Sequence, residues 1–167
     1  FGFSGAAVLG LFPLWRADRR AMLAVRALAP TIGLIESLDL FAGASRIAIE
    51  RVARAAHEVT VPADTVLIRE GDQADALWVL VDGEVAVSAR GEAAHARRLR
   101  TMGAGSYFGE IGLLRGLPRT ATVRTTRPTD FYSLAQADFQ ALLQREPALQ
   151  AVVAETVAGR RMALAQA

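Results

Sequence analysis

The sequence predicts a mainly β domain with flanking helices, namely an antiparallel β-roll or jelly roll that carries N-terminal helices and two C-terminal helices. Between residues 58 and 134, short β-rich pieces alternate with turn signals, whereas the residues on either side place apolar positions at helical spacing. Many short strands at such intervals are typical of an antiparallel barrel or jelly roll. A chain of 167 residues is long enough to give one such domain a proper core.

The first 15 residues differ from the rest because they carry no charge, and arginines follow them directly. Fifteen residues fall short of the roughly 20 that span a bilayer, so we interpret the run as the end of a longer membrane helix. Trp15 would then lie at the interface, and the arginines would mark the cytoplasmic side of the inner membrane. A signal peptide fits less well because its charges precede its apolar stretch. The alternative is a leader that packs on a partner or on the domain itself.

Helical patterns follow in the next 40 residues. We predict a helix over residues 17–29 that Pro30 stops, and short helices over residues 32–41 and 45–56, the last one capped by Ser45. The predicted division of the chain is therefore an apolar segment at 1–15, a helical linker at 16–33 and the folded domain at 34–167.

Seven strands are predicted after these helices. The Asp82-Gly83 pair indicates a tight hairpin, and both Gly71 and Gly83 are expected at turn positions with a positive φ. Residues 90–96 are expected to form a hairpin tip. The predicted strands cover residues 58–61, 65–69, 76–81, 84–89, 97–101, 120–125 and 129–134.

Two helices are predicted to close the chain, at residues 135–144 and from Pro147 onward. Leu149, Val153 and Val157 share one stripe of the last helix, which we expect to pack on the barrel, on another helix or on a second subunit. Gly159 is a possible interruption of this helix.

Composition excludes several classes of function. Cysteine is absent, so disulfides and thiolate chemistry are excluded. His57 and His95 are isolated, and no group of histidines and carboxylates has metal-ligand spacing, so we expect neither a metal site nor phosphodiesterase or other catalysis. All 19 basic residues are arginine, but they are dispersed among 17 acids and the net charge is only +2, so no nucleic-acid partner is expected.

The chemistry of a small-molecule site is concentrated in one strand-loop-strand. Gly109 permits close backbone approach, and the helical turn that follows it presents unpaired N–H groups. An ionised Glu110 is a pure acceptor that suits the hydroxyls of a ribose, whereas the planar fork of Arg119 suits two oxygens of a phosphate. Together these groups describe a ligand with one phosphate and a nearby free hydroxyl. The segment is FGEIGLLRGLPRTATV, residues 108–123.

This segment resembles the phosphate-binding cassette of the cyclic nucleotide-binding domain. The resemblance extends through IREGD at 68–72, LWVLVDGEV at 77–85 and the approach at 103–108, and it covers roughly residues 34–165. It implies that Glu110 accepts the ribose 2′-hydroxyl and that Arg119 pairs with the cyclic phosphate. It also implies that Arg160 of the last helix pairs with the cassette carboxylate and that Leu164 acts as an apolar lid. The remaining pocket residues it implies are Phe108, Gly109, Ile111, Gly112, Leu113, Thr120 and Ala121, with Val87 and Leu99 beside the base.

The expected function is therefore a non-enzymatic sensor of cAMP or cGMP, for which we predict cAMP, without any other cofactor. The apolar start most resembles bacterial major facilitator transporters that carry such a domain at their C-terminus, which places the membrane among the partners. Two alternatives remain open: the sensor part of a Crp-like transcription regulator without its DNA-binding head, and a cassette that has lost its ligand and serves as an interaction scaffold.

Overall fold

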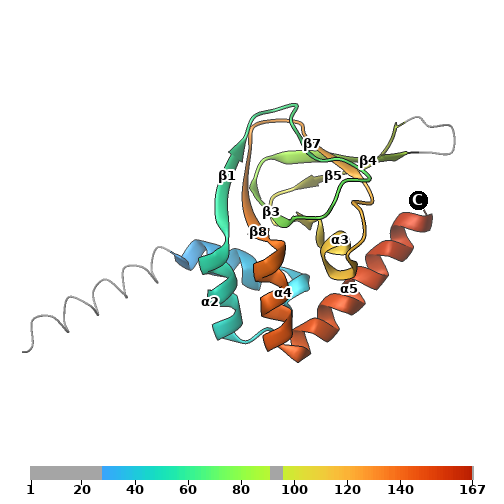
Figure 1. The fold of residues 1–167 in the computed structure, drawn as a ribbon. Helices are drawn as coiled ribbons and strands as arrows, with labels where there is room; N and C mark the ends of the chain where they lie inside the picture. The colour runs from blue at the N-terminus through green and yellow to red at the C-terminus, as the bar shows by residue number, and fades with distance from the viewer. Residues whose placement is uncertain (1–27, 91–95, 167) are drawn as a thin grey trace, which may run out of the picture.

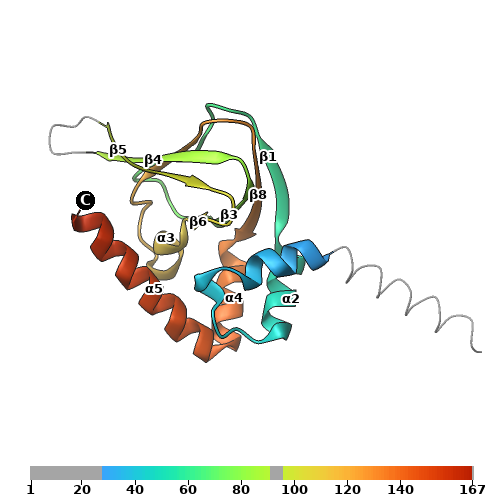
Figure 2. The ribbon, with the colours of Figure 1, turned by 180° about the vertical axis from the view of Figure 1, so that it is seen from behind.

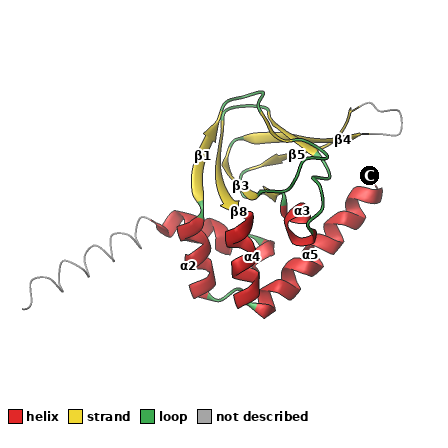
Figure 3. Cartoon of the chain, in the orientation of Figure 1, coloured by secondary structure: helices red, strands yellow, loops and turns green. Residues whose placement is uncertain are grey.

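The computed structural model describes residues 28–90 and 96–166 (Figure 1). The predicted apolar segment, most of the predicted linker and the hairpin tip with His95 lie outside these residues. In the described part, a roll of antiparallel strands lies on a group of helices, and Figure 3 shows the strands and the helices gathered in separate halves of the domain. The predicted fold class is confirmed.

Two four-stranded antiparallel sheets form the roll. One has the strand order β1-β8-β3-β6 and the other β2-β7-β4-β5. Each predicted strand overlaps an observed one. The short β6 was not predicted, because two residues are too few to show the alternation of apolar and polar positions that identifies a strand. The strands are β1 (His57–Val61), β2 (Val66–Ile68), β3 (Ala76–Asp82), β4 (Glu84–Arg90), β5 (Ala96–Gly103), β6 (Tyr107–Phe108), β7 (Thr122–Thr125) and β8 (Thr129–Ala135).

The interior of the roll is an apolar cluster that supports the candidate site. Phe131 is 1% exposed, and the rings of Trp78 and Phe108 meet it edge-on at centroid distances of 5.7 and 5.9 Å. Edge-to-face aromatic packing at these distances is favourable beyond the burial of area alone. Phe108 is the last residue of β6, so this packing fixes the point at which the cassette begins.

The helices form the second half of the domain. Ser45 caps α2 as predicted, because its hydroxyl accepts the N–H of Ala48 at 3.1 Å. Gly71 and Gly83 have φ values of 93° and 116°, which also agrees with their predicted turn roles. Besides a helix at residues 28–36, the helical elements are the 3₁₀ turn η1 (Asp39–Phe41) and the α-helices α2 (Arg46–Ala55), α3 (Glu110–Arg115), α4 (Gln136–Arg145) and α5 (Pro147–Gln166).

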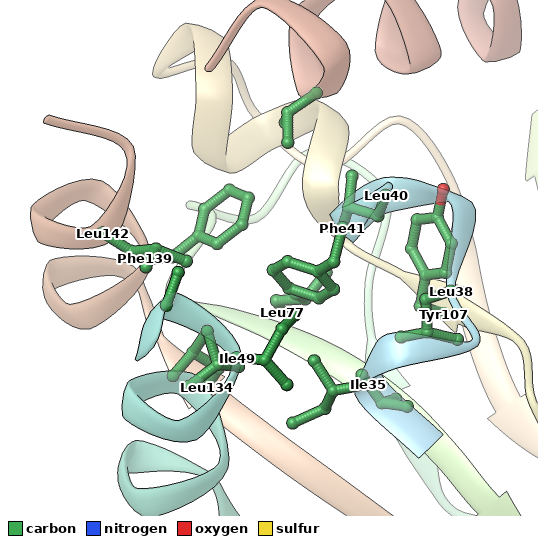
Figure 4. Close-up of a cluster of buried hydrophobic side chains, with 14 of the residues drawn as sticks. Ile35, Leu38, Leu40, Phe41, Ile49, Leu77, Tyr107, Leu134, Phe139 and Leu142 are labelled. Atoms are coloured by element: carbon green, nitrogen blue, oxygen red, sulfur yellow. The ribbon is translucent and has the colours of Figure 1, made fainter. Parts of the chain in front are cut away.

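A second apolar cluster joins these helices to the underside of the roll (Figure 4). Phe139 of α4 is fully buried there, together with Leu40 of η1 and Leu77 of β3. Because the same cluster includes Leu149 and Val153, α5 is packed onto the domain by the stripe that the sequence predicted.

Two helix predictions need correction. Pro30 does not stop a helix, because residues 28–36 are helical on both sides of it. Inside a helix a proline lacks its own N–H bond and its ring crowds the carbonyl four residues before it. The burial of Ile32 and Ile35 on this segment opposes that cost. Gly159 does not interrupt α5, which runs unbroken to Gln166. The intrinsic cost of one helical glycine is only about 1 kcal/mol, which packing overrides.

In both ribbon views α5 runs alongside α3, and Figure 2 shows this from behind. The side chain of Leu164 near the end of α5 lies outside what the structure describes, so its role as a lid stays a prediction. Of the described helices, none combines the length and the apolar composition that crossing a bilayer demands.

Candidate functional site

The site begins where β6 passes into α3. Gly109 is the N-cap of this short helix and has a φ of 94°, a left-handed conformation that glycine adopts without strain. A Cβ at this position would lie 2.5 Å from Nη1 of Arg119 and 2.9 Å from the carbonyl oxygen of Ala76. The absence of a side chain is therefore what lets Arg119 reach the backbone of the cassette.

The cassette closes one side of a cavity in the roll. Nine of the twelve predicted site residues line this cavity, and they come from β4, from the β6–α3 segment and from the loop before β7. The lining residues are Ile68, Val87, Arg100, Phe108, Gly109, Glu110, Ile111, Gly112, Arg119, Thr120, Ala121 and Val123.

Arg119 is held from several sides, although it is 5% exposed and lines the cavity. Its Nη1 donates to the carbonyl of Gly109 at 2.9 Å, and its Nη2 donates to the carbonyl of Ala76 at 2.8 Å and to Oδ1 of Asp75 at 2.7 Å. A guanidinium has five N–H groups, so these bonds leave it donors for a ligand. The side chain is thus oriented before any ligand arrives.

The backbone of Arg119 is fixed as well. Its N–H donates to the carbonyl of Asp72 at 2.8 Å, and its carbonyl accepts the N–H of Gly71 at 2.8 Å. The Gly71-Asp72 turn after β2 therefore holds the loop that carries the arginine. This contact gives the IREGD motif a physical role in the site.

Glu110 is 3% exposed, and its ion-pair partner lies on α5, which is far from it in sequence but close in space. Nη1 of Arg160, on α5, donates to Oε1 of Glu110 at 3.1 Å and to the carbonyl of Tyr107 at 3.1 Å. The guanidinium carbon of Arg160 lies 3.8 Å from the ring centroid of Tyr107, which is a cation–π distance.

Burial and charge act on Glu110 in opposite directions. Burial raises the pKa of the Glu110 carboxyl above 4.5, and the positive charge of Arg160 opposes this rise, with a smaller opposing contribution from Arg100. Burial also raises the pKa of the Tyr107 hydroxyl. Glu110 is consequently a buried acid whose ionisation depends on its arginine neighbours.

Two predicted pocket residues do not line the cavity. Leu113 is 1% exposed and packs in the helical cluster on the other side of α3. Leu99 packs beside the barrel cluster, because a bulge in the β4–β5 ladder pairs Val87 with Arg100 and Ser88 with Arg98. The bulge thus brings Arg100, rather than Leu99, to the cavity opposite Val87.

Arg160, the third predicted residue outside the lining, reaches the site only through its bond to Glu110. Sequence reasoning missed Arg100 and also Asp75, whose exposed carboxylate binds Arg119. No local sequence pattern predicts that Arg100 lines the cavity, because the alternation of apolar and polar residues does not show where a strand has a bulge. For Asp75 the only signal was a second acid three residues after the Gly-Asp turn.

The arrangement suits an anion that carries a hydroxyl. A buried arginine with spare donors faces the cavity beside a buried carboxylate, and apolar walls from Ile68, Val87 and Val123 complete it. Within residues 28–90 and 96–166, no group of three or more potential ligands could hold a metal ion.

Comparison with known proteins gives consistent matches. The chain is 32% identical over 134 residues to the cyclic nucleotide-gated potassium channel mll3241 of Mesorhizobium japonicum, covering 80% of this chain and 36% of the channel. It is 31% identical over 128 residues to the cyclic nucleotide-gated potassium channel RHE_CH03180 of Rhizobium etli, covering 77% of this chain and 34% of that protein. The chain therefore spans about a third of the length of these channels.

Solved structures agree in fold. The regulatory domain of Toxoplasma gondii PKA with cAMP superposes with a TM-score of 0.67 at 29% identity, covering 70% of this chain and 44% of that one. The Thermus thermophilus catabolite activator protein also gives a TM-score of 0.67, at 26% identity, with 77% and 60% covered. The model of the cyclic nucleotide-binding domain matches residues 58–146, which include the whole cassette and Arg119. The chain therefore belongs to the cyclic nucleotide-binding domain family.

Proposed function

We propose that this domain senses cAMP, with Arg119 binding the cyclic phosphate and Glu110 accepting the ribose 2′-hydroxyl. The observation that carries the proposal is the cavity to which both side chains contribute, lined by the segment that matches the family model. Membership in this family makes the chain a regulatory, non-enzymatic domain.

The charges of the two groups support this assignment. A carboxylate beside a phosphate would repel it, so Glu110 suits a neutral hydroxyl, whereas the guanidinium of Arg119 complements the anion. Arg119 already has its Nη2 occupied by Asp75 and Ala76. These bonds do not use the N–H on Nε or the second N–H on Nη1. The two groups lie on opposite edges of the guanidinium, so a phosphate would accept from one of them while the positive charge of the whole group attracts it.

The choice of cAMP over cGMP rests on family likeness, because Thr120 and Arg100 at the cavity present groups compatible with either base. Titration calorimetry with cAMP, cGMP and 2′-deoxy-cAMP tests it. We expect the tightest binding for cAMP and weaker binding for the deoxy analogue. A tenfold tighter affinity for cGMP would reverse the choice of base, and equal binding of the ribo and deoxy forms would contradict the role of Glu110.

We also propose that the domain is the cytoplasmic tail of a bacterial membrane transporter and that nucleotide occupancy controls that transporter. The uncharged run at residues 1–15 with its following arginines supports this, as does the similarity to membrane channels. The test is the coding sequence upstream of Phe1, which should encode several further apolar spans. A soluble segment in that place would contradict the proposal.

A further inference from the structure

Arg160 has a fixed place between three elements of the domain. Besides its bonds to Glu110 and to the carbonyl of Tyr107, its Nη2 lies 4.0 Å from Oδ1 of Asp39 in η1. With the Tyr107 ring 3.8 Å below the guanidinium, the side chain is confined from β6, α3 and η1. Only 24% of it is exposed.

The Glu110 carboxylate depends on this contact more than an exposed carboxylate would. A buried charge is unfavourable unless it is paired and hydrogen-bonded, and the ionised group otherwise takes up a proton. The side chain of Glu110 is 4% exposed, and its ion pair with Arg160 uses Oε1, which leaves Oε2 to accept a hydroxyl from the cavity.

We propose that Arg160 is a positioning residue that keeps the Glu110 carboxylate charged and oriented toward the cavity, and so sets the pH range in which the site accepts a ribose hydroxyl. The effect on ribose binding rests on the proposed function, whereas the effect of Arg160 on the charge of Glu110 does not. The charged state of Glu110 is a property of the free domain and can be measured without a nucleotide.

The groups that face Glu110 predict the direction of the effect. Arg160 on α5 and Arg100 on β5 favour the charged carboxylate, whereas burial acts against it. Asp39 lies 4.0 Å from Nη2 of Arg160 and so is a second acceptor for the same guanidinium. Arg100 is exposed and therefore screened by solvent, so it cannot replace a buried arginine in direct contact. Without Arg160, the Glu110 carboxyl would stay protonated up to a higher pH, and a protonated carboxyl accepts hydrogen bonds more weakly than a carboxylate.

The first test is a titration of the Glu110 side chain by NMR in the nucleotide-free domain, with the signal assigned by its loss in Glu110→Gln. We expect Arg160→Met to move the midpoint upward and Arg160→Lys to keep it near that of the unmodified chain. Arg145→Met, at an exposed arginine of α4, is the matched control and should leave the midpoint unchanged. An unchanged midpoint in Arg160→Met would overturn the proposal.

A second variant covers the case in which Arg160→Met does not fold. Asp39→Asn removes a carboxylate whose side chain is 66% exposed, so the fold should tolerate it. Because Asp39 then no longer attracts Arg160 away from Glu110, the Glu110 midpoint should fall. A rise in the midpoint of this variant would contradict the arrangement.

The second test is cAMP affinity as a function of pH in the unmodified chain and in Arg160→Met. Below the raised midpoint of the variant, affinity should fall by up to about tenfold per pH unit, and it should recover at alkaline pH. A loss of equal size at every pH would indicate only a structural role and overturn the proposal. If no cyclic nucleotide binds the unmodified chain, the proposed function fails, while the NMR titration still decides the role of Arg160.

Discussion

Replacing Arg119 by alanine tests the centre of the site, because the side chain acts in folding as well as in binding. The substitution removes a guanidinium that is 5% exposed and leaves the carbonyls of Gly109 and Ala76 without this donor. A carbonyl that loses its partner away from water costs about 1–3 kcal/mol, and both of these hydrogen bonds are partly buried. Asp75 contributes less than about 1 kcal/mol because its side chain is 81% exposed.

The expected loss in unfolding free energy is therefore about 4 kcal/mol, against a usual total of about 5–15 kcal/mol for a domain. The variant should remain folded at low temperature. Its affinity for cAMP should fall by a further about 2–4 kcal/mol, which is roughly 30-fold to 1,000-fold in Kd, because the phosphate loses its charge-assisted hydrogen bonds.

Urea denaturation without nucleotide measures the first effect, and calorimetry at 15 °C on the folded variant measures the second. Arg115→Ala is the matched control, since Arg115 belongs to the same cassette but is exposed, and it should change either quantity by less than about 0.5 kcal/mol. If Arg119→Ala unfolds more easily yet binds cAMP as tightly as the unmodified chain, the guanidinium only supports the loop and the phosphate has another partner.

Three further substitutions probe the surroundings of Arg119. Gly109→Ala should lower the unfolding free energy by about 2–4 kcal/mol in urea melts, because its methyl group would contact Arg119 and because a φ of 94° strains an alanine. A loss of less than about 1 kcal/mol, close to the effect of an ordinary surface change, would contradict this. The raised pKa of Glu110 means that the native state holds its proton more tightly than the unfolded state. The stability of the unmodified chain relative to Glu110→Gln should therefore fall as pH rises from 4.5 through that raised pKa, and a pH-independent difference would refute the burial argument. Arg100→Ala should change the ratio of cAMP to cGMP affinity in calorimetry while altering stability by less than about 0.5 kcal/mol, since the side chain is exposed; an unchanged ratio would remove Arg100 from base recognition.

The cassette was predictable from sequence because its requirements are local. A glycine at a left-handed position, a carboxylate in the first helical turn and an arginine after a proline are all recorded within residues 108–123. The strands and the Asp82-Gly83 hairpin were predictable for the same reason, since alternation and turn chemistry act over a few residues.

Long-range partners were not predictable in this way. Asp75 lies 44 residues from Arg119 along the chain, and Arg160 lies 50 residues from Glu110. For Arg160 the family resemblance supplied the pairing, whereas the residue pattern alone placed it only on a helical stripe. Arg100 lines the cavity in place of the predicted Leu99 because of one bulge in the β4–β5 pairing. Such a bulge shifts the side chains beyond it to the opposite face of the strand.

The two charged groups of the site are already paired before a nucleotide is present, and this bears on how binding can be transmitted. Arg119 is held by Asp75 and two carbonyls, and Glu110 is held by Arg160 on α5. A ligand can shift a conformational equilibrium only by its differential affinity for the two states. Since α5 contacts the cassette through Arg160, a nucleotide that strengthens or weakens the Glu110–Arg160 ion pair would bias the position of this helix. That ion pair is therefore one point at which the site and the helix are coupled.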